Sequence, residues 1–407
     1  MKILIVNKFL YPNGGSETYI FKIGQELMRL GHEVQYFGME HEGRIVGNHA
    51  NSYTEDMSFH GGGISKLTYP FKILYSRDSR KKIRTVLEDF RPDVVHLNNI
   101  NFQITPSIID EIKAFGPGIR IIYTAHDYQW ICPNHMLKIP STGELCTRCI
   151  HGDYSNCTKN RCIHDSKAQS VLGTLEAKLY QRRETYRLVD TIICPSEFMN
   201  RMLSSNPQLK GRTITLHNFY EEVPEEEMPD QKIMERLPQR YALYFGRYDE
   251  EKGIKTLLKV CQQLPDIPFV FAGKGTCADQ VRAIKNITEL GFLSGETLRY
   301  VIRHAAFSLY PSEWYENCPF SVVESQLLGT PVIASRIGGI PELLSDQKTG
   351  ELFAAGDAAE LKSKIERLWQ DQDKIASYHS QCRDYVTQNM LTLTDYCSRL
   401  LEFYCHS

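Results

Sequence analysis

Two glutamates near the C-terminal end of the 407-residue chain are spaced so that they could bind hydroxyl groups on either side of a phosphate. Phe307–Tyr310 is predicted to be a short buried strand, and Pro319 is a favourable first residue for a helix. Glu316 then lies in the loop between them, and Glu324 lies a turn or more inside the helix. Because a helix N-terminus offers unpaired N–H groups to a phosphate, these residues predict a site for a nucleotide sugar.

A second candidate site follows the predicted strand Tyr241–Phe245, where Arg247 and Lys252 stand in one loop. Two cations there could neutralise a pyrophosphate and stabilise the charge that builds on it as its bond to a sugar breaks. The alternative is an exposed basic pair that is balanced by the acidic residues 249–251.

Two loops of the first half could also contact a ligand. Gly14 and Gly15 follow the first predicted strand and leave room for a close backbone approach, and Ser16 can cap the next helix. The G-x-G-x-x-G spacing is absent, so a tight structural turn is an equal alternative. His126 follows the predicted strand Arg120–Thr124 and is either a hydrogen-bonding site residue or a structural histidine.

Strands and helices alternate along the whole sequence, which predicts an α/β protein with parallel sheets covered on both faces. In the first half we predict strands at Lys2–Asn7, Glu33–Gly38, Val94–Leu97, Arg120–Thr124 and Thr191–Pro195, and helices at Glu17–Leu30, Ser79–Phe90, Ser107–Phe115 and Leu172–Leu188. In the second half we predict strands at Tyr241–Phe245, Phe269–Ala272 and Phe307–Tyr310, and helices at Gly253–Gln263 and Gly295–Ala305.

The two halves are expected to be two Rossmann-like domains, and the acidic run 220–230 with its two prolines to be a solvated linker. We place the domains at residues 1–222 and 223–389, with a C-terminal helix at about 390–407 that joins the first domain. Since ligands bind beyond the carboxyl ends of parallel strands, both domains are expected to face a shared cleft.

Composition narrows the class of protein. The formal net charge is −2, so nothing in the overall charge favours nucleic acid as a partner. The chain contains no run of about 18 apolar residues that could form a transmembrane helix, and the apolar run after Met1 is too short for a signal peptide. We therefore expect a cytoplasmic protein whose 12 cysteines are reduced.

Taken together, the motifs resemble those of the retaining glycosyltransferases of family 4, which have the two-domain GT-B fold. The most specific motif is Glu-x7-Glu, from Glu316 to Glu324. The supporting motifs are Gly14-Gly15, Gly246-Arg247 with Lys252, Phe271–Gly275, Gly291–Leu293, Gly329–Ala334 and Gly338–Glu342. The resemblance implies transfer of a sugar from a UDP- or GDP-sugar to a glycan or polyprenyl-linked acceptor in cell-surface polysaccharide synthesis.

The resemblance also implies a role for each motif. Arg247 and Lys252 would hold the diphosphate, and Glu324 would bind the ribose hydroxyls. Glu316 would contact the donor sugar, His126 would hydrogen-bond that sugar from the other domain, and the Gly15 amide would meet the distal phosphate. The implied catalytic residues are His126, Arg247, Lys252 and Glu316, and the donor-binding residues are Gly14, Gly15, Arg247, Lys252, Gly273, Leu293, Asn317, Pro319, Phe320, Ser321 and Glu324.

The implied reaction is independent of metal, because no Asp-x-Asp stands at the end of a predicted strand. Cations and a helix dipole would stabilise the leaving diphosphate instead. One departure is Ser321, where family members often have glycine, and it leaves the shape of the sugar subsite open. Alternative functions are a GT-B sugar-nucleotide epimerase, a phosphorylase, or a non-catalytic subunit that binds a nucleotide sugar.

A cysteine-rich insertion at about 130–165 has the spacing of a metal site. Cys146, Cys149, Cys157 and Cys162 are candidate ligands for a structural zinc ion, and Cys132 could replace one of them. The alternatives are free thiols in a mobile loop over the acceptor, disulfides, or an iron–sulfur cluster.

The segment Phe71–Arg84 carries six basic residues and one acidic residue. It predicts either contact with the inner-leaflet surface of a membrane or an ordinary solvated helix face.

Overall fold

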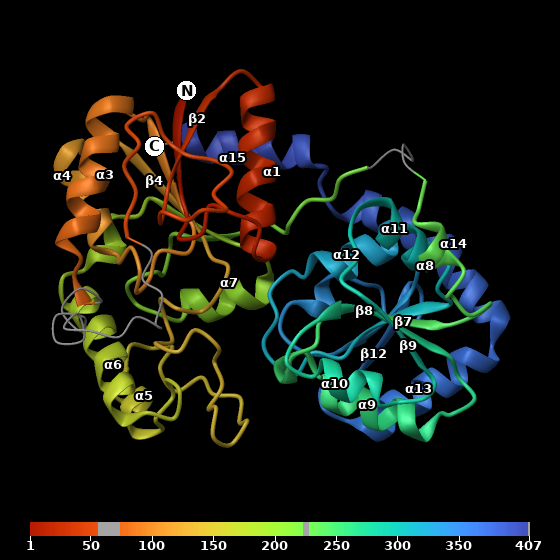
Figure 1. The fold of residues 1–407 in the computed structure, drawn as a ribbon. Coiled ribbons are helices and arrows are strands. Elements are labelled where there is room, and N and C mark those ends of the chain that lie inside the picture. Colours follow the sequence, from red (N-terminus) through yellow and green to blue (C-terminus); the bar gives the residue numbers. More distant parts are fainter. Residues whose placement is uncertain (56–73, 223–227, 406–407) are drawn as a thin grey trace. The chain divides into compact units, whose positions relative to one another are not determined.

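The computed structural model describes residues 1–55, 74–222 and 228–405, which form two compact units. Unit 1 comprises residues 1–217 together with 393–407, and unit 2 comprises residues 218–392. Figure 1 shows the elements of both units.

Unit 1 is built on a six-stranded parallel sheet in the order β2-β1-β3-β4-β5-β6. Its strands are β1 Lys2–Val6, β2 Glu33–Phe37, β3 Val94–Leu97, β4 Arg120–Thr124, β5 Thr191–Cys194 and β6 Thr213–Thr215. Its helices are α1 Gly15–Arg29, α3 Arg77–Phe90, α4 Ser107–Phe115, α5 Ser155–Lys159, α6 Lys167–Arg182, α7 Glu197–Ser204 and α15 Leu393–Cys405, with a 3-10 turn η2 at Thr185–Leu188.

Unit 2 has a second six-stranded parallel sheet, in the order β12-β11-β10-β7-β8-β9. Its strands are β7 Ala242–Arg247, β8 Phe269–Lys274, β9 Ile287–Gly291, β10 Phe307–Tyr310, β11 Val332–Ser335 and β12 Gly350–Phe353. Its helices are α8 Gln231–Met234, α9 Ile254–Gln263, α10 Ala278–Arg282, α11 Gly295–Arg303, α12 Phe320–Leu327, α13 Ala358–Gln370 and α14 Gln372–Asn389, with 3-10 turns η3 Glu250–Lys252 and η4 Ile340–Glu342.

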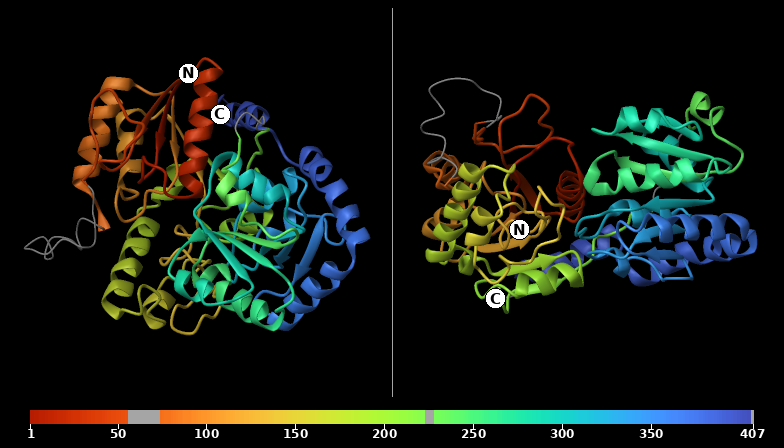
Figure 2. Two further views of the ribbon diagram at one scale, coloured as in Figure 1. Left: turned by 45° about the vertical axis from the view of Figure 1, so that its right-hand side comes forward. Right: turned by 90° about the horizontal axis from the view of Figure 1, so that it is seen from below.

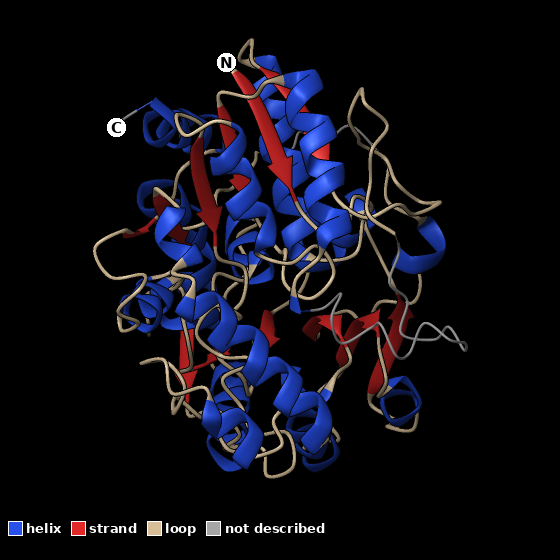
Figure 3. Cartoon of the chain, turned by 90° about the vertical axis from the view of Figure 1, so that its left-hand side faces the viewer, coloured by secondary structure: helices blue, strands red, loops and turns tan. Residues whose placement is uncertain are grey.

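Helices cover both faces of each sheet (Figures 2 and 3), so the strands are buried on both sides. This explains why the strands are runs of consecutive apolar residues rather than alternating patterns, as in Ile3–Val6, whose four side chains are fully buried. The predicted α/β class with two parallel sheets is confirmed.

Several predicted bounds differ from the observed ones. The helix predicted at Leu172–Leu188 begins at Lys167, ends at Arg182 and is followed by η2. Strands β6, β9, β11 and β12 were not predicted; β6, β9 and β12 are edge strands, and β6 and β9 are only partly buried. Residues 71–73 of the basic segment singled out in the sequence lie outside the described residues. No helix within the described residues is long and apolar enough to span a membrane.

The last helix of the chain, α15, belongs to unit 1 and is joined to it by buried hydroxyl groups. The Tyr396 hydroxyl lies 2.9 Å from that of Tyr19 on α1, and the Tyr404 hydroxyl lies 2.6 Å from Nδ1 of His96 on β3. The Tyr19 hydroxyl and Nε2 of His96 both contact Oγ1 of Thr124, at the end of β4. One polar network therefore connects α1, α15 and two strands of the sheet.

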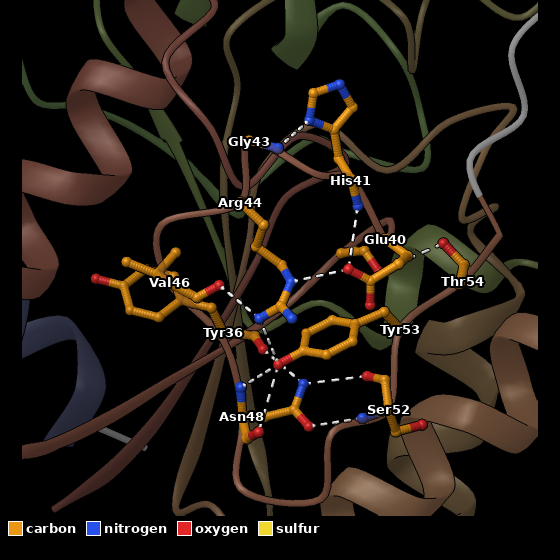
Figure 4. A network of polar contacts seen from close by, with 11 residues as sticks. Tyr36, Glu40, His41, Gly43, Arg44, Val46, Asn48, Ser52, Tyr53 and Thr54 are labelled. Carbon is orange, nitrogen blue, oxygen red and sulfur yellow. Dashed lines mark hydrogen bonds and ion pairs between the residues drawn. The ribbon is translucent and has the colours of Figure 1, made fainter.

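The segment after β2 is folded back by a second polar network, shown in Figure 4. Arg44 donates from Nε to Glu40 and from Nη1 to the hydroxyl of Tyr53, and its guanidinium lies 3.9 Å from the centre of the Tyr53 ring. The His41 ring stacks on Tyr11 at 3.8 Å between ring centres, so this segment supports the loop that follows β1.

Candidate functional site

The order of strands in unit 2 brings two distant loops together. β10 pairs with β7, the first strand of the sheet, and β8 pairs with the other side of β7. The chain therefore leaves β7 and β10 in opposite directions, which makes their carboxyl ends the topological switch point of the sheet, where ligands of such folds bind. The loop after β7 carries Lys252, and the loop after β10 carries Glu316.

Lys252 and Glu316 form a buried ion pair at this switch point. Nζ of Lys252 lies 2.5 Å from Oε1 of Glu316, and the two side chains are 16% and 8% exposed. The same carboxylate oxygen accepts hydrogen bonds from Oγ of Ser312 at 2.9 Å and from Nε1 of Trp314 at 2.7 Å. Three donors from two loops therefore fix the orientation of this carboxylate.

The surroundings of Glu316 determine its charge. Burial favours the protonated acid, but the Lys252 cation and the three hydrogen bonds outweigh it, so the pKa of Glu316 lies below its ordinary value. The residue is therefore a carboxylate at neutral pH and carries no proton to donate. It can accept hydrogen bonds from hydroxyl groups, and it orients the ammonium group of Lys252.

Two glycines allow these loops to approach each other. Gly338 has a φ of +59°, and a Cβ there would lie 2.2 Å from the backbone oxygen of Glu316. Gly253 has a φ of +72°, and a Cβ there would lie within the backbone of Pro311. Both positions combine a left-handed backbone with close packing, so only glycine fits without displacing Glu316 or Lys252.

Arg247 stands at the end of β7 and is 58% exposed. It forms ion pairs with Asp249 at 2.7 Å and with Glu251 at 3.4 Å. These contacts agree with the alternative interpretation, in which the acidic residues 249–251 balance an exposed basic pair. Because the guanidinium is half exposed, it can still exchange these partners for a phosphate.

The helix after Glu316 begins one residue later than predicted. Phe320 is the first residue of α12, and Pro319 precedes it with an extended backbone. Ser321 lies in the first turn, beside the Tyr310 hydroxyl, and Glu316 lies beside the same hydroxyl. Tyr310 therefore connects the start of α12 with the ion pair. Asn317 lies in the same loop, directly after Glu316.

Glu324 lies in the second turn of α12 and is only partly accessible. Burial raises its pKa, and Arg299 on α11 acts in the opposite direction. Arg299 is itself held by Glu296 at 2.7 Å, and Arg303 binds the other oxygen of Glu296 at 2.5 Å. Glu324 thus has no direct carboxylate–cation pair among the described residues, which leaves its oxygens available to hydroxyl groups.

The remaining predicted donor-binding residues of unit 2 lie at the carboxyl ends of neighbouring strands. Gly273 lies in β8, where a Cβ would lie 1.9 Å from the backbone oxygen of Gly246 on β7. Leu293 follows β9 and is partly buried, whereas its neighbour Phe292 is 67% exposed.

In unit 1, His126 follows β4 and is held by Asn98, which follows β3. Nε2 of His126 lies 2.8 Å from Oδ1 of Asn98. The Asn98 amide group donates to the backbone oxygens of Val6 and His96, so its oxygen is the acceptor and Nε2 carries the proton. Burial lowers the pKa of His126 to about 3. The imidazole is neutral, and Nδ1 is left as an acceptor without a described partner.

The loop after β1 lies at the same edge of this sheet, since β1 pairs with β3. Gly14 caps α1, and Gly15 is its first residue; both are exposed, and a Cβ on Gly15 would meet nothing within 4 Å. The prediction that Ser16 caps α1 is wrong, because Ser16 lies inside the helix and bonds to Glu17. The start of α1 therefore has no hydrogen bond from its backbone amides to a capping side chain.

The candidate zinc cysteines line one small cavity in unit 1. Cys132, Cys146, Cys149, Cys157 and Cys162 surround about 10 Å³ together with Asn134, Lys138, Asn156 and Asn160. All five cysteines are free thiols, and burial raises the pKa of Cys132 to about 12. Within the described residues, no three His, Cys, Asp or Glu side chains are grouped so that they could hold a metal ion. The zinc site stays a prediction.

Three residues of these sites were not predicted from the sequence: Asn98, Ser312 and Trp314. Asn98 directly follows a predicted buried strand, so the strand-end rule that selected His126 could have found it. Ser312 and Trp314 lie between strand and helix in the motif of Glu316, but nothing in their spacing shows that they turn toward its carboxylate.

Comparison with known proteins identifies the family. Residues 13–221 match the sequence profile described as Glycosyltransferase Family 4, and residues 226–387 match the one described as Glycosyl transferases group 1. The chain belongs to glycosyltransferase family 4. This glycosyltransferase is 22% identical over 369 residues to an uncharacterized 42.6 kDa protein in the cps region of Klebsiella pneumoniae, a match that covers 84% of this chain and 87% of that protein.

A human relative of this glycosyltransferase is a component of phosphatidylinositol N-acetylglucosaminyltransferase, 22% identical over 365 residues. The match covers 84% of this chain but only 64% of the human protein. Among solved structures, Anabaena HepE in complex with UDP-glucose superposes with a TM-score of 0.66 at 16% identity, over 99% of both chains. This likeness shows that the glycosyltransferase has the GT-B fold.

Proposed function

We propose that this protein is a retaining glycosyltransferase that moves a sugar from a nucleoside diphosphate sugar to a glycan or lipid-linked acceptor. A UDP-sugar is the first candidate donor, and a GDP-sugar is the second. The observation that carries the proposal is the Lys252–Glu316 pair at the switch point of unit 2. It presents an ammonium group for a phosphate next to a carboxylate that can accept a sugar hydroxyl. The UDP-glucose complex of the similarly folded HepE supports UDP as the first nucleotide to test.

In this proposal each cation binds the part of the donor that becomes more negative during the reaction. Lys252 and Arg247 bind the diphosphate, and the amide groups at the start of α12 and at Gly15 add further donors. Glu324 accepts the ribose hydroxyls, and Gly273 and Leu293 lie beside the base. Glu316 and the free Nδ1 of His126 accept hydroxyls of the donor sugar.

The chemical step follows from these charges. The bond between the anomeric carbon and the diphosphate oxygen breaks, and the electron pair leaves with the diphosphate. The acceptor hydroxyl attacks the same face of the sugar and gives its proton to the departing phosphate oxygen, which retains the configuration at the anomeric carbon. In this scheme Lys252 and Arg247 stabilise the leaving group, so the step does not require a metal ion.

The test is binding of UDP and GDP to the full-length protein by calorimetry, followed by hydrolysis of the matching sugar donors. We expect Glu316→Gln to keep most of the nucleotide affinity and to lose turnover by roughly two orders of magnitude or more. Glu324→Gln should weaken nucleotide binding. Turnover that is unchanged in Glu316→Gln would contradict the proposed role of this residue.

A further inference from the structure

Asn98 contacts the candidate site residue His126 from the end of the neighbouring strand. β3 and β4 are paired in parallel, with Leu97 opposite Tyr123, so the residues that follow the two strands lie close together. Asn98 is fully buried, whereas His126 is partly accessible. A ligand can therefore reach the imidazole but not the amide group, and any effect of Asn98 on a ligand has to act through His126.

The backbone around Asn98 fixes the orientation of its amide group. Nδ2 lies 3.3 Å from the backbone oxygens of Val6 and His96, and a carbonyl oxygen can only accept. A flipped amide would place Oδ1 against these two acceptors. Oδ1 therefore makes the 2.8 Å contact with Nε2 of His126, and that nitrogen has to carry the proton.

Nδ1 of His126 has no partner among the described residues, so it is the ring nitrogen left for a ligand. The Tyr19 ring meets the imidazole edge-on, with 5.0 Å between ring centres. The Tyr19 hydroxyl is bonded to Thr124 and Tyr396. The contact with Tyr19 therefore holds the imidazole by packing and supplies no proton to Nδ1.

No charged group beside the ring favours its protonation. Burial lowers the pKa of His126 to about 3, and no carboxylate of the described residues is paired with it. Tyr19 and His96 lie near the ring, and burial keeps both uncharged, because it raises the pKa of Tyr19 and lowers that of His96 to about 3. The carboxylate of Asp127 accepts from the backbone N–H of Gln129. Nδ1 therefore presents a lone pair at every pH between about 5 and 8.

We propose that Asn98 is a positioning residue that makes His126 a hydrogen-bond acceptor, so that the position of the donor sugar opposite Nδ1 must carry a hydrogen-bond donor. This role rests on the proposed function, in which His126 contacts that sugar. It defines a substrate class. Sugars with a hydroxyl or an amide N–H at this position fit, and sugars with a carboxylate or an ether oxygen there are rejected, since two lone pairs would face each other.

The first test determines which nitrogen of His126 carries the proton, in the full-length protein with isotope-labelled histidine. A long-range proton–nitrogen correlation spectrum distinguishes the two tautomers and the imidazolium, and the signals missing from H126Q assign His126 among the 13 histidines. We expect a proton on Nε2 and no titration between about pH 5 and 8. In Asn98→Leu, which keeps the shape of asparagine but has no acceptor, the tautomer with the proton on Nδ1 should appear. Asn99→Leu, at a partly accessible neighbour, is the matched control and should leave the His126 signals unchanged.

The second test measures donor specificity with UDP-glucose, or with the donor that the hydrolysis assay selects, and with its deoxy and deoxyfluoro analogues. Fluorine cannot donate, so at the position opposite His126 the fluoro analogue should lose as much kcat/KM as the deoxy analogue, roughly tenfold. Asn98→Leu should lose a similar factor with the unmodified donor and become insensitive to both analogues at this position. Its UDP affinity should be unchanged, because Lys252 and Glu324 lie in unit 2.

Several results would overturn the proposal. Wild-type His126 could be protonated at Nδ1 or charged in this pH range, or Asn98→Leu could show the wild-type tautomer and the wild-type pattern of analogues. A fluoro analogue that restores turnover would show that His126 donates. The wild-type spectrum and the analogue series decide the matter even if Asn98→Leu does not fold. If Nε2 carries the proton but no sugar donor is hydrolysed, the proposed function is wrong and the sugar specificity is overturned with it, whereas Asn98 still orients His126.

Discussion

At the scale of single residues, Lys252 and Glu316 depend on each other. The carboxylate stays ionised although it is buried, because a cation and two neutral donors surround one of its oxygens. The ammonium group lies between this carboxylate and the rings of Trp314 and Tyr310, at 5.3 and 5.9 Å from their centres. A ligand phosphate would add a second anion to a lysine that is already oriented.

This dependence predicts an asymmetric result in a double-mutant cycle. Lys252→Met should destabilise unit 2 by about 3 kcal/mol, because it leaves a buried carboxylate without its cation. Adding Glu316→Gln should restore a large part of that loss. Both changes can be measured by unfolding the protein with a chemical denaturant and following hydrogen exchange in peptides from unit 2. Additive losses in the double variant would show that the two side chains do not act as a pair.

At the scale of elements, the positions of the functional loops could be predicted because each follows a run of apolar residues that must be a buried strand. This reasoning located Lys252, Glu316 and His126 at strand ends. It could not pair Lys252 with Glu316, since their contact depends on β10 lying beside β7, and strand order leaves no local signal. Asn98 also follows a predicted strand and the same rule could have selected it, but its bond to His126 depends on β3 lying beside β4.

The buried carboxyl group of Glu176, on helix α6, should make the stability of unit 1 depend on pH. The folded-state pKa of Glu176 is raised to about 8, well above that of an unfolded chain, so folding retains a proton. Its contribution to stability is complete below the unfolded pKa and is lost as pH rises through about 8. Glu176→Gln should remove this loss and, at pH 9, stabilise unit 1 by a few kcal/mol. Thermal unfolding from pH 5 to 9 measures the effect, and parallel curves for both proteins would contradict it.

The cysteine cavity gives a prediction that separates zinc from free thiols. If Cys146, Cys149, Cys157 and Cys162 hold zinc, protein purified without chelator should contain one zinc ion per chain by elemental analysis. Cys149→Ser should lose that zinc and unfold the insertion at lower temperature. Absence of zinc, with all 12 cysteines of the chain open to thiol reagents after denaturation, would favour free thiols.

At the scale of the whole molecule, α15 makes the two ends of the chain part of one unit. Its Tyr396 and Tyr404 hydroxyls hydrogen-bond with Tyr19 and His96. The ring of Tyr19 in turn lies 5.0 Å from the ring of the candidate site residue His126. The helix therefore contributes to the geometry of the site without touching a ligand.

The prediction at this scale concerns Tyr396→Phe and Tyr404→Phe. Each removes a hydroxyl from the buried network of Tyr19, Thr124 and His96 and should destabilise unit 1 by about 1–2 kcal/mol. Unit 2 should keep its hydrogen-exchange protection. Ser398→Ala, on the exposed side of α15, is the control. Equal loss of protection in both units would show that they unfold together.

The same helix constrains how the protein is made. While a ribosome is still synthesising unit 2, all six strands of the unit 1 sheet have been synthesised, but Tyr19 and His96 lack the hydroxyls of Tyr396 and Tyr404. The nascent unit 1 therefore lacks these buried hydrogen bonds until residues 218–392 have emerged. Its final consolidation therefore depends on α15, which follows unit 2 in the sequence.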